Sequence, residues 1–199
     1  VLIPAYKPDD RLIQLTRELK EEKLDVLLVD DGGQKPFAPI FEKCRALGAE
    51  IAVHAVNQGK GRALKTGLNA ALNIWPDLSG VVTADADGQH TLRDILRIIE
   101  AMREHPNALV LGSREFTGDV PFKSRWGNRI TRFVYALASG VHVSDTQTGL
   151  RGLPACAIPA MITIDGERYE YEMNVLLKLR DMKLGVVEVP IETIYIDDN

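Results

Sequence analysis

The first half of the chain alternates between short apolar runs and longer stretches whose apolar residues recur at helical spacing. The apolar runs are short and rich in β-branched residues, as is typical of buried strands. They predict strands at 1–3, 26–29, 51–56, 80–84 and 108–112. The periodic stretches predict helices at 8–23, 37–47, 61–75 and 91–105. Strands and helices in this alternation predict an α/β fold, with a Rossmann-like, mostly parallel sheet flanked by helices.

After about Gly118 the pattern changes. Helical spacing predicts helices at 128–139 and 169–183, separated by a polar, turn-rich segment at 144–149. A last strand is predicted from Val186 onward. Because no linker composition separates the two halves, we expect one domain over residues 1–199.

Composition restricts the class of protein further. With 45% hydrophobic and 26% charged residues in 199, the chain has the composition of one globular domain. A net charge of −4 argues against a nucleic-acid partner, which requires a basic face. Cys44 and Cys156 lie far apart without a CxxC motif, so we expect two reduced thiols and a cytoplasmic location.

The two ends of the sequence suggest a longer protein. The chain begins on Val1 without a methionine and ends on Asn199 within a strand-like alternation, so we expect truncation at both ends. No run of eighteen apolar residues is present, so we expect no membrane-spanning helix within this sequence. A membrane anchor would then belong to a removed segment.

Acidic residues follow two of the predicted strands. Asp85 and Asp87 come directly after the strand at 80–84, and Asp31 follows the strand at 26–29. In open parallel sheets ligands bind beyond the carboxyl ends of the strands. Two carboxylates at such an end suit Mg²⁺ or Mn²⁺ together with substrate phosphates. Asp31 would accept hydrogen bonds from a base or ribose. The alternative is that the segment around Asp31 is an ordinary β-turn.

Basic residues gather in two places. The glycine-rich segment 57–63 carries Lys60 and Arg62 at the start of a predicted helix, where it would either hold an anion or simply cap the helix. A second cluster contains Lys123, Arg125, Arg129 and Arg132, with Arg114 upstream. Its arginines at helical spacing would share one face, which is either solvated or holds a phosphate. The four histidines show no metal-ligand spacing, so we interpret them as structural or surface residues.

Six segments in this order resemble the family-2 glycosyltransferases of the GT-A fold. The resemblance extends to the branch that includes dolichol-phosphate mannosyltransferase and other polyprenyl-phosphate glycosyltransferases. The segments are IPAY at 3–6, VDDG at 29–32, NQGKG at 57–61, ADADGQH at 84–90, DTQTGLR at 145–151 and VPIET at 189–193. They span nearly the whole chain, and their order is more specific than any one of them.

The resemblance implies roles for individual residues. It implies that Pro4, Ala5, Tyr6 and Asp31 hold the nucleotide of a UDP- or GDP-sugar, and Lys60 would join them on the substrate. It implies that Asp85 and Asp87 bind Mg²⁺ or Mn²⁺, with Gln89 as a third ligand. It implies that Arg114, Arg129 and Arg151 contact donor or acceptor phosphates, and we add Arg125 on its position in the basic cluster. Residues 1–117 would form the nucleotide-sugar-binding half and 118–199 the acceptor-side half.

The resemblance also implies an inverting hexosyl transfer, and the acceptor depends on whether a general base is present. Gly33 stands where the family usually has Ser, and Phe122 replaces the Gln of the QxxRW motif found in processive synthases. No Glu-Asp pair of the usual base type is evident. A polyprenyl phosphate would need no base, because a phosphate monoester with a second pKa of about 6 is already anionic.

We therefore expect transfer to polyprenyl phosphate at the cytosolic face of a membrane. Asp87 and Arg129 are the candidate catalytic residues for this reaction. Transfer to a saccharide hydroxyl, with Asp145 or Glu172 as base, is the alternative within enzymes. A catalytically silent nucleotide-binding module is the alternative outside them. The glycine spacing does not support a dinucleotide-binding dehydrogenase.

Overall fold

The chain folds around one seven-stranded sheet. The structure is a computed structural model, and it describes residues 1–33, 35–114, 145 and 148–192. The strands in spatial order are β3 (Glu50–Val53), β2 (Leu27–Asp30), β1 (Leu2–Ala5), β4 (Gly80–Thr83), β6 (Arg151–Pro154), β5 (Ala108–Arg114) and β7 (Gly185–Ile191). Strands β3, β2, β1 and β4 are mutually parallel, as are β5 and β7. Strand β6 runs antiparallel to β4 and β5, so the sheet is mostly parallel, as expected.

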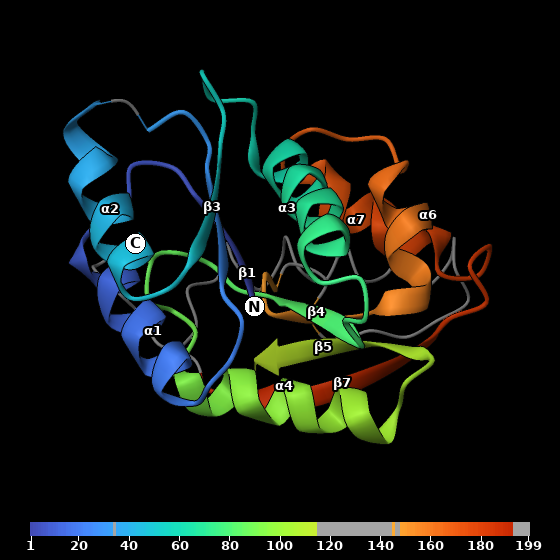
Figure 1. Cartoon of the computed structure of the whole chain (residues 1–199). Helices are drawn as coiled ribbons and strands as arrows, with labels where there is room; N and C mark the ends of the chain where they lie inside the picture. The colour runs from blue at the N-terminus through green and yellow to red at the C-terminus, as the bar shows by residue number, and fades with distance from the viewer. Residues whose placement is uncertain (34, 115–144, 146–147, 193–199) are drawn as a thin grey trace, which may run out of the picture.

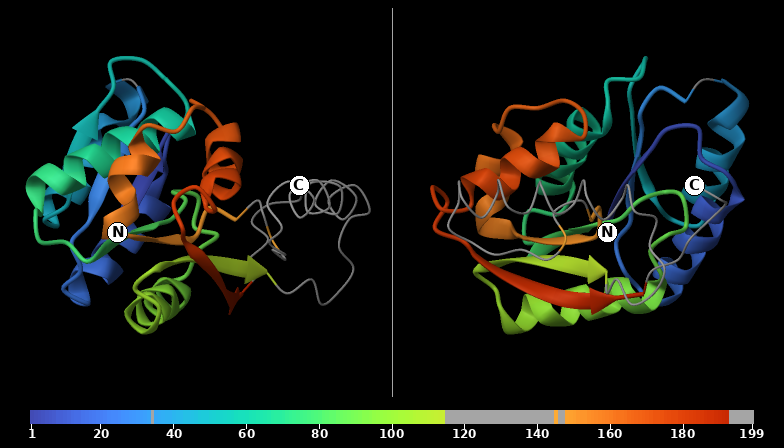
Figure 2. Two further views of the ribbon diagram at one scale, coloured as in Figure 1. Left: turned by 90° about the vertical axis from the view of Figure 1, so that its right-hand side faces the viewer. Right: turned by 180° about the vertical axis from the view of Figure 1, so that it is seen from behind.

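Helices cover both faces of this sheet. They are α1 (Asp10–Glu21), α2 (Ala38–Ala46), α3 (Lys60–Ile74), α4 (Leu92–Glu104), α6 (Ile158–Ile162) and α7 (Glu170–Lys178). Short 3₁₀ turns at Lys35–Phe37 and Ala155–Ala157 precede α2 and α6. Helices α3, α6 and α7 lie together on one face, and α1, α2 and α4 lie on the other (Figures 1 and 2). This arrangement confirms the layered α/β prediction.

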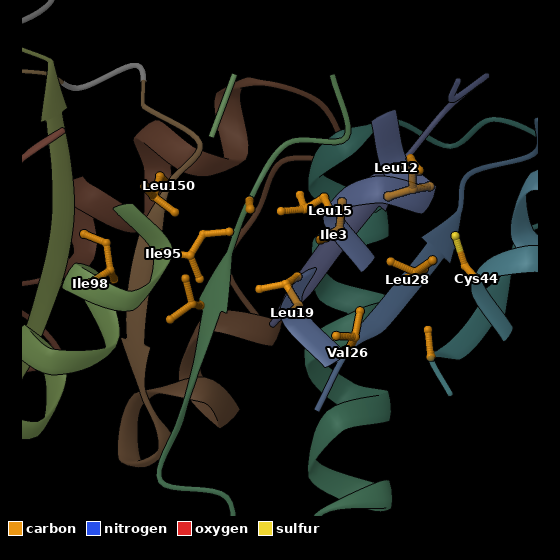
Figure 3. Packing of buried hydrophobic residues seen from close by; sticks show 14 of the residues in the cluster. Ile3, Leu12, Leu15, Leu19, Val26, Leu28, Cys44, Ile95, Ile98 and Leu150 are labelled. Carbon is orange, nitrogen blue, oxygen red and sulfur yellow. The ribbon is translucent and has the colours of Figure 1, made fainter. Parts of the chain in front are cut away.

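Each face of the sheet has its own apolar core. Leu27 and Val29 of β2 pack toward α3, whereas Leu28 of the same strand packs toward α1 and α2. Figure 3 shows the second core, in which Ile3 and Leu28 lie near the leucines of α1, with Ile95 and Ile98 of α4 further along the sheet. A strand buried on both faces needs apolar residues at every position, and this explains its unbroken apolar run.

Strand β6 is an element that the sequence pattern missed. Arg151–Pro154 contains an arginine, a glycine and a proline, which are poor indicators of a strand. All four residues are buried because β4 and β5 pair with the segment from both sides. Tertiary pairing therefore decides its conformation. The short helix α6 was also not predicted.

Several boundaries differ from those predicted. The strand expected at 51–56 ends at Val53. The helix expected at 169–183 ends at Lys178, and the chain then turns through Lys183, which has a positive φ of 56°. The backbone N–H of Leu184 donates to the carbonyl of Leu179 at 3.0 Å and closes this turn. The helix predicted at 128–139 and the boundary between residues 117 and 118 lie outside the described residues.

Two other sequence expectations concern the cysteines and membrane helices. Both cysteines are free thiols, with Cys44 buried on α2 and Cys156 exposed. Burial raises the pKa of the Cys44 thiol, although a hydrogen bond from Thr16 opposes the shift. Among the helices of the described ranges, none has both the length and the apolarity that a bilayer crossing requires.

The packing of α4 on the sheet predicts a large effect of Ile95→Ala. Ile95 is fully buried, so its truncation should lower the free energy of unfolding by about 2–5 kcal/mol in urea denaturation. The control is Leu177→Ala on α7, because Leu177 is 40% exposed and should change stability by about 0.5 kcal/mol or less. Equal effects of the two substitutions would contradict this description of the core.

Candidate active site

A cleft of about 550 Å³ lies at the carboxyl ends of β1, β2 and β4. The start of α3 and the segment before α7 complete its walls. The residues that line it include seven that were predicted from the sequence as site residues: Pro4, Ala5, Tyr6, Asp31, Lys60, Asp85 and Asp87. The structure thus brings together segments far apart in the sequence, in the place where open α/β sheets bind ligands.

Asp31 connects the loop after β2 to the start of α3. Asp31 is 3% exposed, and both of its carboxylate oxygens accept hydrogen bonds. The backbone N–H groups of Gln58 and Gly59 donate to it at 2.8 and 2.9 Å, and the amide of Asn57 donates at 3.0 Å. His54 Nδ1 lies 2.7 Å from Oδ1, and its other ring nitrogen lies 2.9 Å from the hydroxyl of Thr66. The carboxylate therefore fixes the glycine-rich turn.

Gly59 allows this turn to approach the segment before α7. Its φ is +99°, and a Cβ there would overlap the backbone carbonyl of Glu167. In return, the backbone N–H of Arg62 donates to that same carbonyl at 2.9 Å, and the Arg62 side chain forms an ion pair with the Glu167 carboxylate. The cation Arg62 is thus bound to a carboxylate of the chain.

Lys60, the first residue of α3, joins two acidic segments. Its Nζ lies 2.7 Å from Oδ1 of Asp85 and 3.1 Å from Oε2 of Glu172 on α7. Burial alone would lower the pKa of Lys60, but the charges of Asp85 and Glu172 outweigh it and raise that pKa above its usual range. Lys60 is therefore a fully charged ammonium between two carboxylates.

Asp85 lies in a tight pocket between Lys60 and the 148–151 segment. Burial would raise the pKa of its carboxyl, but hydrogen bonding to His90 and the charge of Lys60 hold that pKa well below the usual range. His90 Nε2 lies 3.1 Å from Oδ2. A Cβ at position 149 would overlap the carboxylate, which explains why glycine stands there. The carbonyl of Gly149 accepts a hydrogen bond from Thr83 at 2.8 Å, so this approach is fixed.

Asp87 is exposed at the edge of the cleft, and its Oδ1 accepts a hydrogen bond from the backbone N–H of Gln89 at 3.0 Å. The residues that could hold a metal ion are thus two carboxylates two positions apart, both lining one cleft. In the part of the chain that is described, no group of three or more His, Cys, Asp or Glu side chains could hold a metal. The oxygen-only donor pair fits Mg²⁺ or Mn²⁺, which commonly use one or two carboxylates and complete their shell with phosphate oxygens and water.

Four other predicted residues lie away from the cleft lining, namely Gln89, Arg114, Asp145 and Arg151. Asp145 is fully buried, and its Oδ2 accepts from Nε of Arg114 at 2.6 Å. Arg151, also buried, donates to the backbone carbonyls of Thr148 and Glu172 at 2.9 and 2.6 Å. Gln89 is partly buried and is not among the cleft-lining residues. The predicted Arg125 and Arg129, with Lys123 and Arg132, lie outside the described residues.

Some cleft residues were missed by the sequence reasoning. Lys7, Arg168 and Tyr169 line the cleft, and Tyr169 is 78% exposed. Lys7 has a positive φ of 53°, and its ammonium lies 5.1 Å from the centre of the Tyr6 ring. The position of Lys7 directly after the IPAY segment was an available signal. His90, interpreted from the sequence as structural or surface, is buried, and its Nε2 lies 3.1 Å from Oδ2 of Asp85.

The sequence profile of Glycosyl transferase family 2 matches residues 1–166 of this chain. The chain therefore belongs to glycosyl transferase family 2, and the expected class of enzyme is confirmed.

Curated relatives agree with this assignment. The chain is 31% identical to the UDP-N-acetylglucosamine–dolichyl-phosphate N-acetylglucosaminyltransferase of Methanococcus voltae, over 98% of this chain and 85% of the relative. It is 25% identical to the polyprenol monophosphomannose synthase of Mycolicibacterium smegmatis, over 96% of this chain and 75% of that protein. The relatives thus include polyprenyl-phosphate glycosyltransferases, as the sequence motifs suggested.

Solved structures support the GT-A fold. Glucosyl-3-phosphoglycerate synthase of Mycobacterium tuberculosis, in complex with Mn²⁺, UDP and glucosyl-3-phosphoglycerate, superposes with a TM-score of 0.70 at 16% identity. The match covers 100% of this chain and 71% of the synthase. A second mycobacterial protein superposes with the same TM-score at 15% identity, and this chain spans 64% of its length. At these identities the likeness shows the fold, and the GT-A prediction is confirmed at that level.

The hydrogen bonds of Asp31 predict that Asp31→Asn is destabilising. An asparagine would turn a donor toward one of the N–H groups that Asp31 now accepts from, and that buried N–H would lose its acceptor. We expect the free energy of unfolding to fall by about 1–3 kcal/mol in urea denaturation. Asp77→Asn, at an exposed position, serves as the matched control and should have little effect. A similarly small effect at Asp31 would contradict its role in fixing the turn.

Proposed function

We propose that this protein transfers a hexose from a UDP- or GDP-sugar to the phosphate of a polyprenyl phosphate, with inversion at the anomeric carbon. The observation that carries the proposal is the single cleft in which the IPAY segment, Asp31 and the Asp85–Asp87 pair meet. Its position at the carboxyl ends of the strands agrees with nucleotide binding. Membership in glycosyl transferase family 2 supports the reaction class.

The donor would lie along the cleft from β1 to β4. Pro4, Ala5 and Tyr6 would contact the base and ribose, because they follow β1 on one side of the cleft. Asp31 would act mainly by shaping the adjoining turn, since its two oxygens are already hydrogen-bonded within the chain. Lys7 and Arg168 add positive charge to the cleft, which suits a diphosphate.

Asp85 and Asp87 would hold Mg²⁺ or Mn²⁺, with Gln89 near enough in sequence to contribute. A bound divalent cation offsets the negative charge that grows on the leaving diphosphate. The position of the bound cation would be set by the carboxylates of the chain, because Gly149 and His90 fix the Asp85 side chain. The structural neighbour that carries Mn²⁺ and UDP supports this assignment.

The acceptor would be an anion that needs no deprotonation. An oxygen of the lipid phosphate would form the bond to the anomeric carbon as the bond to the nucleoside diphosphate breaks. The two candidate bases argue against a hydroxyl acceptor, because Asp145 is fully buried against Arg114 and Glu172 is 8% exposed beside Lys60. Arg125 and Arg129 would orient the acceptor phosphate, with Arg114 and Arg151 in supporting positions. The polyprenyl-phosphate transferases among the relatives agree with this acceptor.

The proposal predicts metal-dependent transfer of labelled sugar into lipid. A panel of UDP- and GDP-sugars would be incubated with polyprenyl phosphate and Mn²⁺, and the solvent-extracted lipid counted. We expect label from one donor, loss of label with EDTA, and a rate at least about 100-fold lower for Asp87→Ala. Asp77→Ala removes an exposed carboxylate before β4, far from its carboxyl end, and should retain full activity.

The possible results separate the two parts of the proposal. Label in lipid that survives both EDTA and Asp87→Ala would overturn the metal assignment. Release of nucleotide with no label in lipid would overturn the acceptor and favour a saccharide. Absence of both lipid label and donor turnover for every sugar nucleotide would contradict the proposal that this chain catalyses glycosyl transfer.

A further inference from the structure

A row of four charged side chains runs inward from the cleft. Asp85 contacts Lys60, Lys60 contacts Glu172, and Oε1 of Glu172 lies 4.0 Å from Nε of Arg151. Only Asp85 and Lys60 line the cleft, and the other two side chains lie behind them. Glu172 therefore lies next to the site, but the proposed reaction gives it no role.

Lys60 presents a difficulty for a cation on Asp85. Its ammonium already lies 2.7 Å from the Asp85 carboxylate. A divalent cation on the same carboxylate would be repelled by this ammonium, and the repulsion is strong where water is partly excluded. Binding of the cation is therefore easier when a second carboxylate holds Lys60.

Glu172 has the charge and the fixed position to do this. It lies 3.1 Å from the Lys60 ammonium and is 8% exposed. The Arg151 guanidinium donates to its backbone carbonyl at 2.6 Å, which anchors this turn of α7. A Cβ at Gly61 would overlap the side chain of Tyr171, so α7 packs closely against the start of α3 (Figure 1). These contacts hold the backbone of Glu172 beside the start of α3.

The two oxygens of the Glu172 carboxylate differ in their contacts, and Oε2 lies 3.1 Å from the Lys60 ammonium. The second oxygen of that carboxylate, Oε1, is buried and accepts no hydrogen bond within the described part of the chain. An unsatisfied carboxylate oxygen is costly to bury, which strengthens the attraction of Glu172 for a nearby cation. Two cations are near it: Lys60, 3.1 Å from Oε2, and Arg151, 4.0 Å from Oε1, and of these Lys60 is the closer.

We propose that Glu172 is a positioning residue that retains the Lys60 ammonium and so leaves Asp85 available to Mg²⁺ or Mn²⁺. The proposal rests on the metal assignment made under the proposed function. It assigns Glu172 no contact with the substrate and no proton transfer. It explains why a buried glutamate on α7 faces the first residue of α3.

The test measures Mn²⁺ affinity directly, by the electron paramagnetic resonance signal of free Mn²⁺ during titration without nucleotide. Lys60→Met removes the competing ammonium and should tighten Mn²⁺ binding. Glu172→Gln leaves Lys60 with Asp85 alone and should weaken Mn²⁺ binding on the order of 10-fold. The two neighbouring substitutions thus have opposite expected signs, which loss of structure does not produce.

The double variant Lys60→Met, Glu172→Gln isolates the mechanism. Without Lys60, the change at Glu172 should alter Mn²⁺ affinity by no more than about 2-fold, because its effect passes through Lys60. Glu104→Gln, an exposed carboxylate at the end of α4, is the charge-matched control and should bind Mn²⁺ like the unchanged protein. Thermal unfolding of each variant checks that the fold is retained.

Each outcome has a distinct meaning. Weaker binding for Glu172→Gln that is equally large in the Lys60→Met background would show that Glu172 acts on the cation itself, and would overturn the proposal. Unchanged binding for Glu172→Gln would also overturn it. Failure of the unchanged protein to bind Mn²⁺, both without nucleotide and with UDP or GDP present, would instead overturn the underlying metal assignment, and the proposal with it.

Discussion

The cleft depends first on the buried carboxylate of Asp31. It accepts hydrogen bonds from the turn at 57–59, and this turn leads directly into α3. The position of α3 then determines where Lys60 meets Asp85 and Glu172. The carboxylate of Asp31, at the end of β2, thereby fixes the Lys60 ammonium at the end of β4. The cost of leaving its buried N–H partners without an acceptor keeps this arrangement in place.

The sheet topology supplies the second half of the site. Strand β6 runs antiparallel between β4 and β5, so the segment that leads into it arrives beside the carboxyl end of β4. Gly149 comes against the Asp85 carboxylate in this way, and Arg151 comes against Glu172. A parallel strand at this place would enter from the opposite edge of the sheet. The antiparallel strand thus connects the DTQTGLR segment to the Asp85–Asp87 pair.

The sequence predicted the part of this structure that is periodic and local. Apolar runs and helical spacing located β1 to β5 and α1 to α4, because burial on both faces of a parallel sheet leaves a clear pattern. The pattern also placed Asp31, Asp85 and Asp87 at strand ends, and the structure gathers them in one cleft. Strand β6 could not be found in this way, because its pairing partners are distant and its composition is that of a turn.

Contacts between segments far apart in the chain could not be predicted from the sequence either. His90 carries no metal-ligand spacing, and only the folded chain shows that it faces Asp85. Lys60 and Arg62 suggested an anion site, but the structure pairs both with carboxylates from residues 167 and 172. Such pairings depend on the packing of α7 against α3, which periodicity does not encode. Arg151 is a similar case, since its guanidinium lies buried against backbone carbonyls.

We propose that the carboxylates at the end of β4 hold a divalent cation against a nucleoside diphosphate. The most direct measurement is an anomalous difference map from a crystal of the protein grown with Mn²⁺ and UDP or GDP. We expect one strong peak at about 2.0–2.2 Å from carboxylate oxygens of Asp85 or Asp87, with diphosphate density beside it. A nucleotide bound in this cleft with no peak at either carboxylate, or with Mn²⁺ held elsewhere, would contradict the metal assignment.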